Sequence, residues 1–187
     1  VIHIRDQVKE ILVSQGGADT YGVVPRLVRD LGKWLNRNEA IKMHIHIGPA
    51  FKHTYELKQA MMGYGGQMVC HMDVDDMASL LSSVDIAIVS TGILVFELGA
   101  IGVPVAMVTQ EEKGLETAKI LYKEIGGHNF GKYTADTSEK LIIYLDELVG
   151  SYENRKALPE NSKRFVDGRG GDRVIKIIRK SLASADY

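Results

Sequence analysis

Two glycine turns, each between a short apolar strand and a helix, are the features of this sequence best suited to chemistry. The first turn, 15–19, follows the apolar segment 10–14, and the second contains Gly92 and follows the apolar segment 85–89. Glycine lets the backbone approach a bound group closely, and a helix that begins after such a turn offers free N–H groups to an anion. Both turns are therefore candidate phosphate sites, and we expect Gly92 to adopt a positive φ.

Glu97 lies about one turn into the helix that follows Gly92, where its carboxylate would meet the hydroxyl groups of a sugar. An ordinary strand–helix–strand unit with a solvated glutamate explains the same pattern. Two glycine turns favour binding, because a doubly wound sheet points such loops at one crevice. The sequence contains neither G-x-G-x-x-G nor the P-loop motif, which argues against an NAD enzyme and a P-loop NTPase.

Composition narrows the class of protein. The chain has 187 residues, of which 45% are hydrophobic, which suits one domain with a sizeable core. With 23 Lys and Arg against 24 Asp and Glu, it has no basic field for nucleic acid. No apolar run approaches the ~20 residues of a membrane span. The single cysteine, Cys70, predicts a buried thiol in a reducing compartment, and we expect a cytoplasmic protein.

Strand and helix patterns alternate along the whole chain. This alternation predicts an α/β fold, a Rossmann-like doubly wound parallel sheet of about six strands with helices on both faces, over residues 1–187 as one domain. We expect Thr137 to cap its helix and the last helix to dock on the sheet rather than on a membrane. The expected strands lie near 10–14, 42–47, 67–71, 85–89, 104–108 and 128–130, and the expected helices near 22–36, 53–62, 75–83, 93–101, 112–125, 137–149 and 171–182.

Histidines offer a second possible chemistry. His44 and His46 alternate on one strand, so their side chains face the same way. That spacing can begin a metal site, but no nearby motif supplies a third ligand, so packing is favoured and neither a metal nor a cofactor is expected. His71 ends the third strand and His128 lies near the last one, and both are candidates for lining the crevice.

Taken in order, several segments resemble one family. They are 11–19, 77–81, 84–88, 92–97, 102–104, 128–131 and 166–170, together with Arg173. On these residues the chain resembles the carboxyl-terminal half of the spore-coat polysaccharide biosynthesis family, which includes the UDP-sugar hydrolase of the pseudaminic acid pathway. The resemblance covers nearly the whole chain and implies half of a glycosyltransferase B-type architecture.

The resemblance also implies a ligand, a UDP-sugar or related nucleotide-sugar, and a role for individual residues. The diphosphate would lie against two turns, contributed by Gly16, Gly17, Gly92, Ile93 and Leu94. Glu97 matches the glutamate that binds the ribose. The base would lie against the loop after the third strand, at His71, Met72, Val74 and Met77. The sugar side would fall at Glu112, Lys113 and Glu116.

This sequence departs from the family pattern at two places. Family members carry Ser or Thr just after the glycine of the second turn, where this chain has Ile93 and Leu94, so hydroxyl donors to phosphate are missing. The family's Asn-Gln pair is replaced near Lys113 and Gly114. Three carboxylates close to that position would repel a diphosphate by about 1 kcal/mol each, namely those of Glu111, Glu112 and Glu116.

The family's G-x-G-H-x-x-R motif, whose histidine is taken to activate water, belongs to the amino-terminal half and does not occur here. We therefore interpret the chain as the nucleotide-sugar-binding half of a two-domain hydrolase or glycosyltransferase of surface-polysaccharide biosynthesis, inactive without its missing amino-terminal domain. The reaction would be displacement at the anomeric carbon, with two helix amino termini stabilising the diphosphate. The alternatives are a non-catalytic binding or assembly module with a degraded site, and an unrelated Rossmann-like enzyme with another phosphorylated ligand.

Overall fold

Six parallel strands form one sheet in the computed structural model, which describes residues 4–125, 127–158, 162 and 165–183. Both ends of the expected domain, 1–3 and 184–187, lie outside the described residues. The sheet order is β3-β2-β1-β4-β5-β6, which confirms the predicted doubly wound fold. The strands are β1 (Glu10–Ser14), β2 (Lys42–Ile47), β3 (Met68–Met72), β4 (Ile86–Val89), β5 (Val105–Thr109) and β6 (His128–Lys132).

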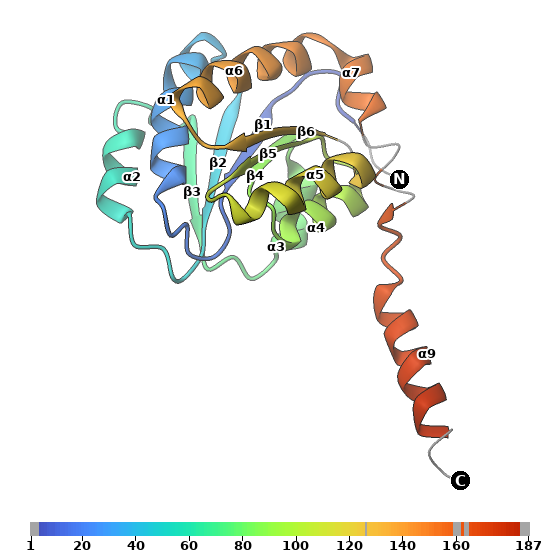
Figure 1. Cartoon of the computed structure of the whole chain (residues 1–187). Helices are drawn as coiled ribbons and strands as arrows, with labels where there is room; N and C mark the ends of the chain where they lie inside the picture. Colours follow the sequence, from blue (N-terminus) through green and yellow to red (C-terminus); the bar gives the residue numbers. More distant parts are fainter. Residues whose placement is uncertain (1–3, 126, 159–161, 163–164, 184–187) are drawn as a thin grey trace.

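Helices cover both faces of the sheet (Figure 1). The apolar residues of α1 recur every three or four positions, and this stripe buries Trp34 completely against the sheet. The first face is covered by α1 (Val23–Arg37), α2 (Thr54–Met61) and α6 (Ala135–Gly150). The second face is covered by α3 (Met77–Ser83), α4 (Ile93–Ile101) and α5 (Lys113–Ile125).

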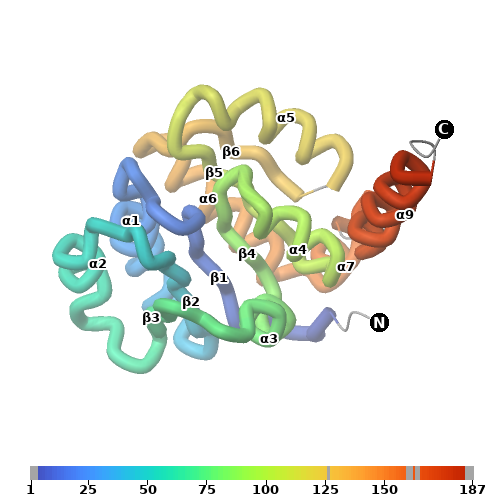
Figure 2. The backbone as a smooth tube through the Cα atoms, turned by 90° about the horizontal axis from the view of Figure 1, so that it is seen from below, coloured from blue at the N-terminus to red at the C-terminus, as the bar shows by residue number. Residues whose placement is uncertain are grey.

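The strand order reverses between β1 and β4. These two strands pair directly, with Ser14 opposite Val89 at their carboxyl ends. Figure 2 shows β1 and β4 side by side in the middle of the fold. In an open α/β sheet, the crevice outside the carboxyl ends at such a reversal is the usual place for a ligand. The fold therefore brings the turns after β1 and β4 to one position.

Two local expectations from the sequence were wrong, and one helix was missed. Helix α6 is capped by Thr134, whereas Thr137 is the third residue of that helix and completes a reciprocal capping box. Cys70 is exposed, because β3 is an edge strand that neighbouring elements cover only in part. The sequence patterns also missed the short helix α7 (Tyr152–Ala157), which is too short for a clear period.

The expectation that the last helix docks on the sheet was also wrong. Helix α9 (Gly170–Ala183) has no buried residue, and both views show it standing away from the sheet (Figures 1 and 2). Both sheet faces already carry helices, so neither offers α9 an open surface. Its apolar side chains are exposed at Val174, Ile175, Ile177, Ile178 and Leu182. Within the described residues, no helix is long and apolar enough to cross a membrane.

A buried arginine ties the segment just before β1 to helices α6 and α7. Arg155 on α7 is 1% exposed, and its guanidinium donates to the backbone oxygen of Leu148 at the end of α6. It also donates to the backbone oxygens of Arg5 and Asp6, at 2.9 and 2.8 Å. Because these acceptors come from distant segments, the arginine fixes where the chain enters β1.

Replacing this arginine should destabilise the fold. Arg155→Met keeps much of the side-chain volume but leaves several carbonyl oxygens without a donor, so we expect the free energy of unfolding to fall by about 2–4 kcal/mol. Urea denaturation followed by circular dichroism measures the change. Lys156→Met is the matched control, because Lys156 is the exposed neighbour on the same helix. Equal stability of the two variants would contradict this role.

Candidate functional site

The turns after β1 and β4 meet around one hydroxyl group, that of Ser90. The backbone N–H of Ser90 donates to the carbonyl oxygen of Ser14, at 3.3 Å. A Cβ atom added at Gly16 would lie 3.8 Å from Ser90 Oγ, and one added at Gly92 would lie 4.0 Å from it. The structure therefore brings the two predicted glycine turns together, with the Ser90 hydroxyl between them.

The two glycine turns differ in backbone conformation. Gly16 has a φ of 78°, which favours glycine, whereas Gly92 has a φ of −127°, which any residue adopts. The expectation of a positive φ at Gly92 was therefore wrong, because the chain passes from β4 into α4 in an extended conformation. Gly48 is the residue required for close approach here, since a Cβ atom added to it would lie 2.5 Å from the Cα of Gly17, whereas one added at Gly17 would meet nothing within 4 Å.

Only one of the two expected helix amino termini is open. The Asp19 carboxylate accepts hydrogen bonds from the backbone N–H groups of Val23 and Val24, both at 2.8 Å, and so occupies the start of α1. Asp19 is 1% exposed; burial raises its pKa, and the two hydrogen bonds oppose that shift. The expectation that two helix termini face the diphosphate is thus corrected, because an internal carboxylate already fills the first one.

Helix α4 presents the open terminus. Its N-cap residue, Gly92, has no side chain that could accept from the N–H groups of the first turn. The next residue, Ile93, is 76% exposed, so a ligand can reach its backbone. Unsatisfied N–H groups and the helix dipole together favour an anion at such a place. Glu97 is exposed on the same helix, about one turn further on.

Three hydroxyl residues lie close to the starts of α4 and α5, although none directly follows the glycine as in the family pattern. A Cβ added at Gly114 would lie 3.1 Å from Thr91 Oγ1 and 3.2 Å from Thr109 Cβ. Both threonines therefore lie beneath the first turn of α5, and Thr91 directly follows Ser90 in the sequence. Sequence reasoning missed these three residues, and the available signal was the pair of hydroxyl residues directly before Gly92.

Two buried polar side chains near the turns have no protein partner. Thr109 Oγ1 and the side-chain amide of Gln15 make no hydrogen bond within the described part of the chain, although both residues are at most 2% exposed. The backbone oxygen of Gln15 accepts from Gln110 Nε2 at 2.7 Å, which ties the β1 turn to the loop after β5. Buried polar groups are normally paired, and these two exceptions both lie at the carboxyl ends of strands, since Thr109 ends β5 and Gln15 follows β1.

The predicted sugar side lies at the start of α5, next to the same turns. Glu112, Lys113 and Glu116 are exposed. Glu116 pairs with Lys119 at 2.7 Å, and Glu111 accepts a hydrogen bond from Tyr21 Oη at 3.1 Å. Partnered carboxylates repel a nearby anion less, so the structure weakens the repulsion that the sequence suggests.

The predicted base side lies along β3 and the start of α3. His71 and Met72 end β3, Val74 follows in the loop, and Met77 is the first residue of α3. Met72 is 55% exposed and Met77 is half-buried, so this side offers an apolar surface open to a ligand.

The other histidines in the described part of the chain take part in hydrogen bonds or ring packing. His46 Nδ1 lies 3.0 Å from Ser14 Oγ, which in turn accepts from the backbone N–H of Gly16. Burial, helped by nearby His71, lowers the pKa of His46 and keeps its ring neutral at pH 7. His128 begins β6, at the amino-terminal edge of the sheet, and packs against Phe130, so it does not line the crevice. Among the described residues, no group of three or more His, Cys, Asp and Glu side chains is placed to hold a metal ion.

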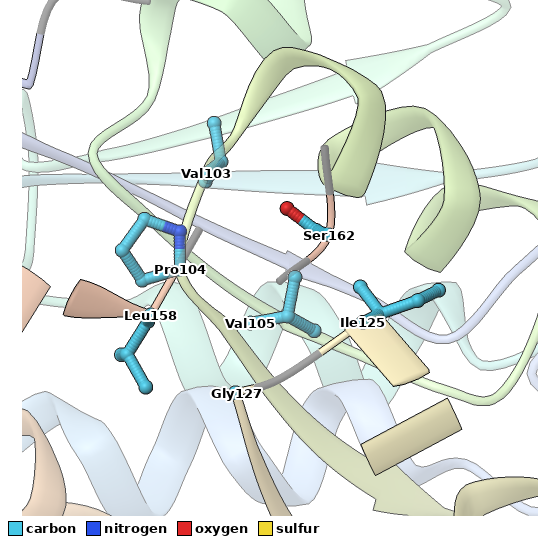
Figure 3. Close-up of a pocket in the computed structure, with 7 residues that line it drawn as sticks. All are labelled: Val103, Pro104, Val105, Ile125, Gly127, Leu158 and Ser162. Atoms are coloured by element: carbon cyan, nitrogen blue, oxygen red, sulfur yellow. The ribbon is translucent and has the colours of Figure 1, made fainter. Parts of the chain in front are cut away.

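A small cavity lies at the amino-terminal ends of the strands, away from the glycine turns (Figure 3). It is lined by Val105 at the start of β5, by Gly127 just before β6 and by Ser162. Its volume of about 10 Å³ is at the lower limit for a single water molecule. The cavity is therefore too small for a nucleotide and lies away from the glycine turns.

Comparisons with known proteins find a relative that matches nearly the whole chain. No protein-family model matches the chain. The spore coat polysaccharide biosynthesis protein SpsG of Bacillus subtilis is 27% identical over 176 residues, which are 94% of this chain and 51% of that protein. The chain thus spans about half the length of this relative.

Two solved structures resemble the chain over nearly its whole length, and in each of them the match takes up somewhat less than half of the solved protein. The calicheamicin glycosyltransferase CalG4 matches 98% of this chain and 44% of its own, with a TM-score of 0.69 and 16% identity. The UDP-GlcNAc 2-epimerase of Neisseria meningitidis bound to UDP-GlcNAc matches 95% and 45%, with a TM-score of 0.67 and 12% identity. The chain is therefore a homologue of SpsG, with the Rossmann-like fold of one half of a glycosyltransferase B-type protein.

Proposed function

We propose that this chain binds a nucleotide-sugar, specifically a UDP-sugar, as the carboxyl-terminal half of a two-domain enzyme. The observation that carries the proposal is the open amino terminus of α4, which meets the Gly16 turn across the Ser90 hydroxyl. Backbone N–H groups and hydroxyls arranged in this way suit a diphosphate. The resemblance to SpsG and to glycosyltransferase structures supports a role with nucleotide-sugars.

The sheet order also supports this ligand. Across the sheet, β3 lies on one side of the paired strands β1 and β4, and β5 lies on the other side. A diphosphate between the two glycine turns would therefore point its nucleoside toward β3 and its sugar toward α5. Glu97 on α4 would bind the ribose, Met72 would contact the base, and Lys113 would be close to the sugar.

In the whole protein, the reaction would be displacement at the anomeric carbon by water or by an acceptor hydroxyl. This half would hold the leaving diphosphate and stabilise the charge that it develops. The attacking group would come from the missing amino-terminal domain. The second candidate, a non-catalytic binding module, is favoured by Ile93 and Leu94, which stand where the family carries hydroxyl residues.

Removing the proposed ribose ligand should weaken nucleotide binding. Glu97→Ala loses charge-assisted hydrogen bonds to the ribose, so the affinity for UDP should fall by about 1–3 kcal/mol in titration calorimetry. Glu124→Ala is the matched control, since Glu124 is exposed near the far end of α5. Unchanged affinity of Glu97→Ala, with clear binding by the parent chain, would remove Glu97 from the site.

A side chain at Gly92 should block the diphosphate without unfolding the protein. Its φ is compatible with any residue and a Cβ atom has free space, so Gly92→Val should cost at most about 1 kcal/mol of stability, through a poorer N-cap. We expect UDP binding to be lost while the thermal melting curve stays close to that of the parent.

Gly150→Val serves as the control for this variant, because a side chain at Gly150, the last residue of α6, also has free space. The control should keep both the stability and the UDP affinity of the parent. If folded Gly92→Val binds UDP as tightly as the parent does, the diphosphate lies elsewhere.

A further inference from the structure

A continuous chain of three side chains crosses β1, β2 and β3. The carboxylate Oε2 of Glu10 lies 2.7 Å from His44 Nε2, and His44 Nδ1 lies 2.7 Å from His71 Nε2. The side chains of His44 and Glu10 are only 14% and 24% exposed, so water competes weakly for these hydrogen bonds. Neither the predicted roles nor the family pattern assigns a function to Glu10 or His44.

The position of each proton follows from the acceptor at the end of this chain when the His44 ring is neutral. An ionised carboxylate can only accept, so His44 Nε2 must carry the hydrogen that Glu10 receives. A doubly protonated His44 ring would donate from both nitrogens and reverse the order, whereas a neutral imidazole has one donor and one acceptor, which makes His44 Nδ1 an acceptor. His71 Nε2 must then donate to it, and the remaining nitrogen of His71, Nδ1, is left as an acceptor.

His71 lies where the base of a bound nucleotide would be. It pairs with His46 across the sheet, and His46 pairs with Ser14, the residue just before the Gln15–Gly16 turn. With adjacent strands about 4.8 Å apart, β3 lies roughly 10 Å to one side of β1. His71 is half-buried, and burial, with a smaller effect of His44, lowers its pKa, so the ring stays neutral at pH 7.

We propose that Glu10 and His44 are positioning residues that hold His71 as the Nε2–H tautomer, so that its Nδ1 accepts a hydrogen bond from the N3–H group of a bound uracil. This inference rests on the proposed function, because it requires a nucleotide at the β1–β4 turns. It adds a selection rule to that function. A base with an imino N–H group can donate to His71 Nδ1. Cytosine cannot, because its N3 is itself an acceptor, so the lone pairs of N3 and of His71 Nδ1 would face each other.

Methylation of the uracil nitrogen tests the hydrogen bond directly. The probes are UDP and 3-methyl-UDP, which lacks the N3–H group, titrated calorimetrically into the purified chain at pH 7.5. We expect the parent to bind UDP about tenfold or more tightly than 3-methyl-UDP. In His71→Ala the affinity for UDP should fall and the two ligands should bind about equally, because the acceptor is gone.

The positioning role has its own readout. Nitrogen-15 NMR of the imidazole rings should show Nε2–H tautomers at both His44 and His71. In Glu10→Ala the tautomer of His71 should become mixed, and the preference for UDP over 3-methyl-UDP should shrink, although His71 itself remains. His128→Gln, at the opposite edge of the sheet, is the matched control and should keep the parent's preference.

The outcomes separate this inference from the proposed function. If the parent binds UDP but His71→Ala keeps the full preference over 3-methyl-UDP, another group contacts N3 and only this inference is overturned. An Nδ1–H tautomer of His71 in the parent overturns it as well. If the parent binds neither ligand, both this inference and the proposed function fail.

Discussion

The direct pairing of β1 with β4 is the constraint on which the candidate site depends. Backbone hydrogen bonding between the strands sets Ser14 opposite Val89, and the N–H of Ser90 continues the ladder to the carbonyl of Ser14. Since the ladder fixes the strand ends to one level, the turns that follow must leave the sheet side by side. Turns separated by more than 70 residues in sequence therefore share one hydroxyl group, that of Ser90.

Much of the fold was predictable because its strands are short, apolar and regularly separated by helices. Strand β4 is buried at every position, as expected for a central parallel strand. The errors arose where a pattern does not show which surface is available. The amphipathic stripe of α9 predicts that the helix packs against an apolar surface. It does not show that other helices already cover both faces of the sheet. Likewise, the sequence around Cys70 does not show that β3 is an edge strand.

The candidate site was predictable only in part. Glycine spacing located the turns, and the alternation of strands and helices implied that they meet. The sequence did not show which helix terminus is open, because that depends on where the carboxylate of Asp19 points. The Glu10–His44–His71 chain was also beyond sequence reasoning, since its members come from three strands whose order emerges only in the folded sheet.

The central claim is that a nucleoside diphosphate lies at the open amino terminus of α4. Titration of the nitrogen-15-labelled chain with UDP, followed through the backbone amide signals, tests it most directly. We expect the largest shifts at Gly16, Ile93 and Leu94, with small shifts at Val23 and Val24, whose N–H groups are already bound by Asp19. Shifts centred on the start of α1, or on Val103 and Val105 at the amino-terminal ends of the strands, would contradict this claim.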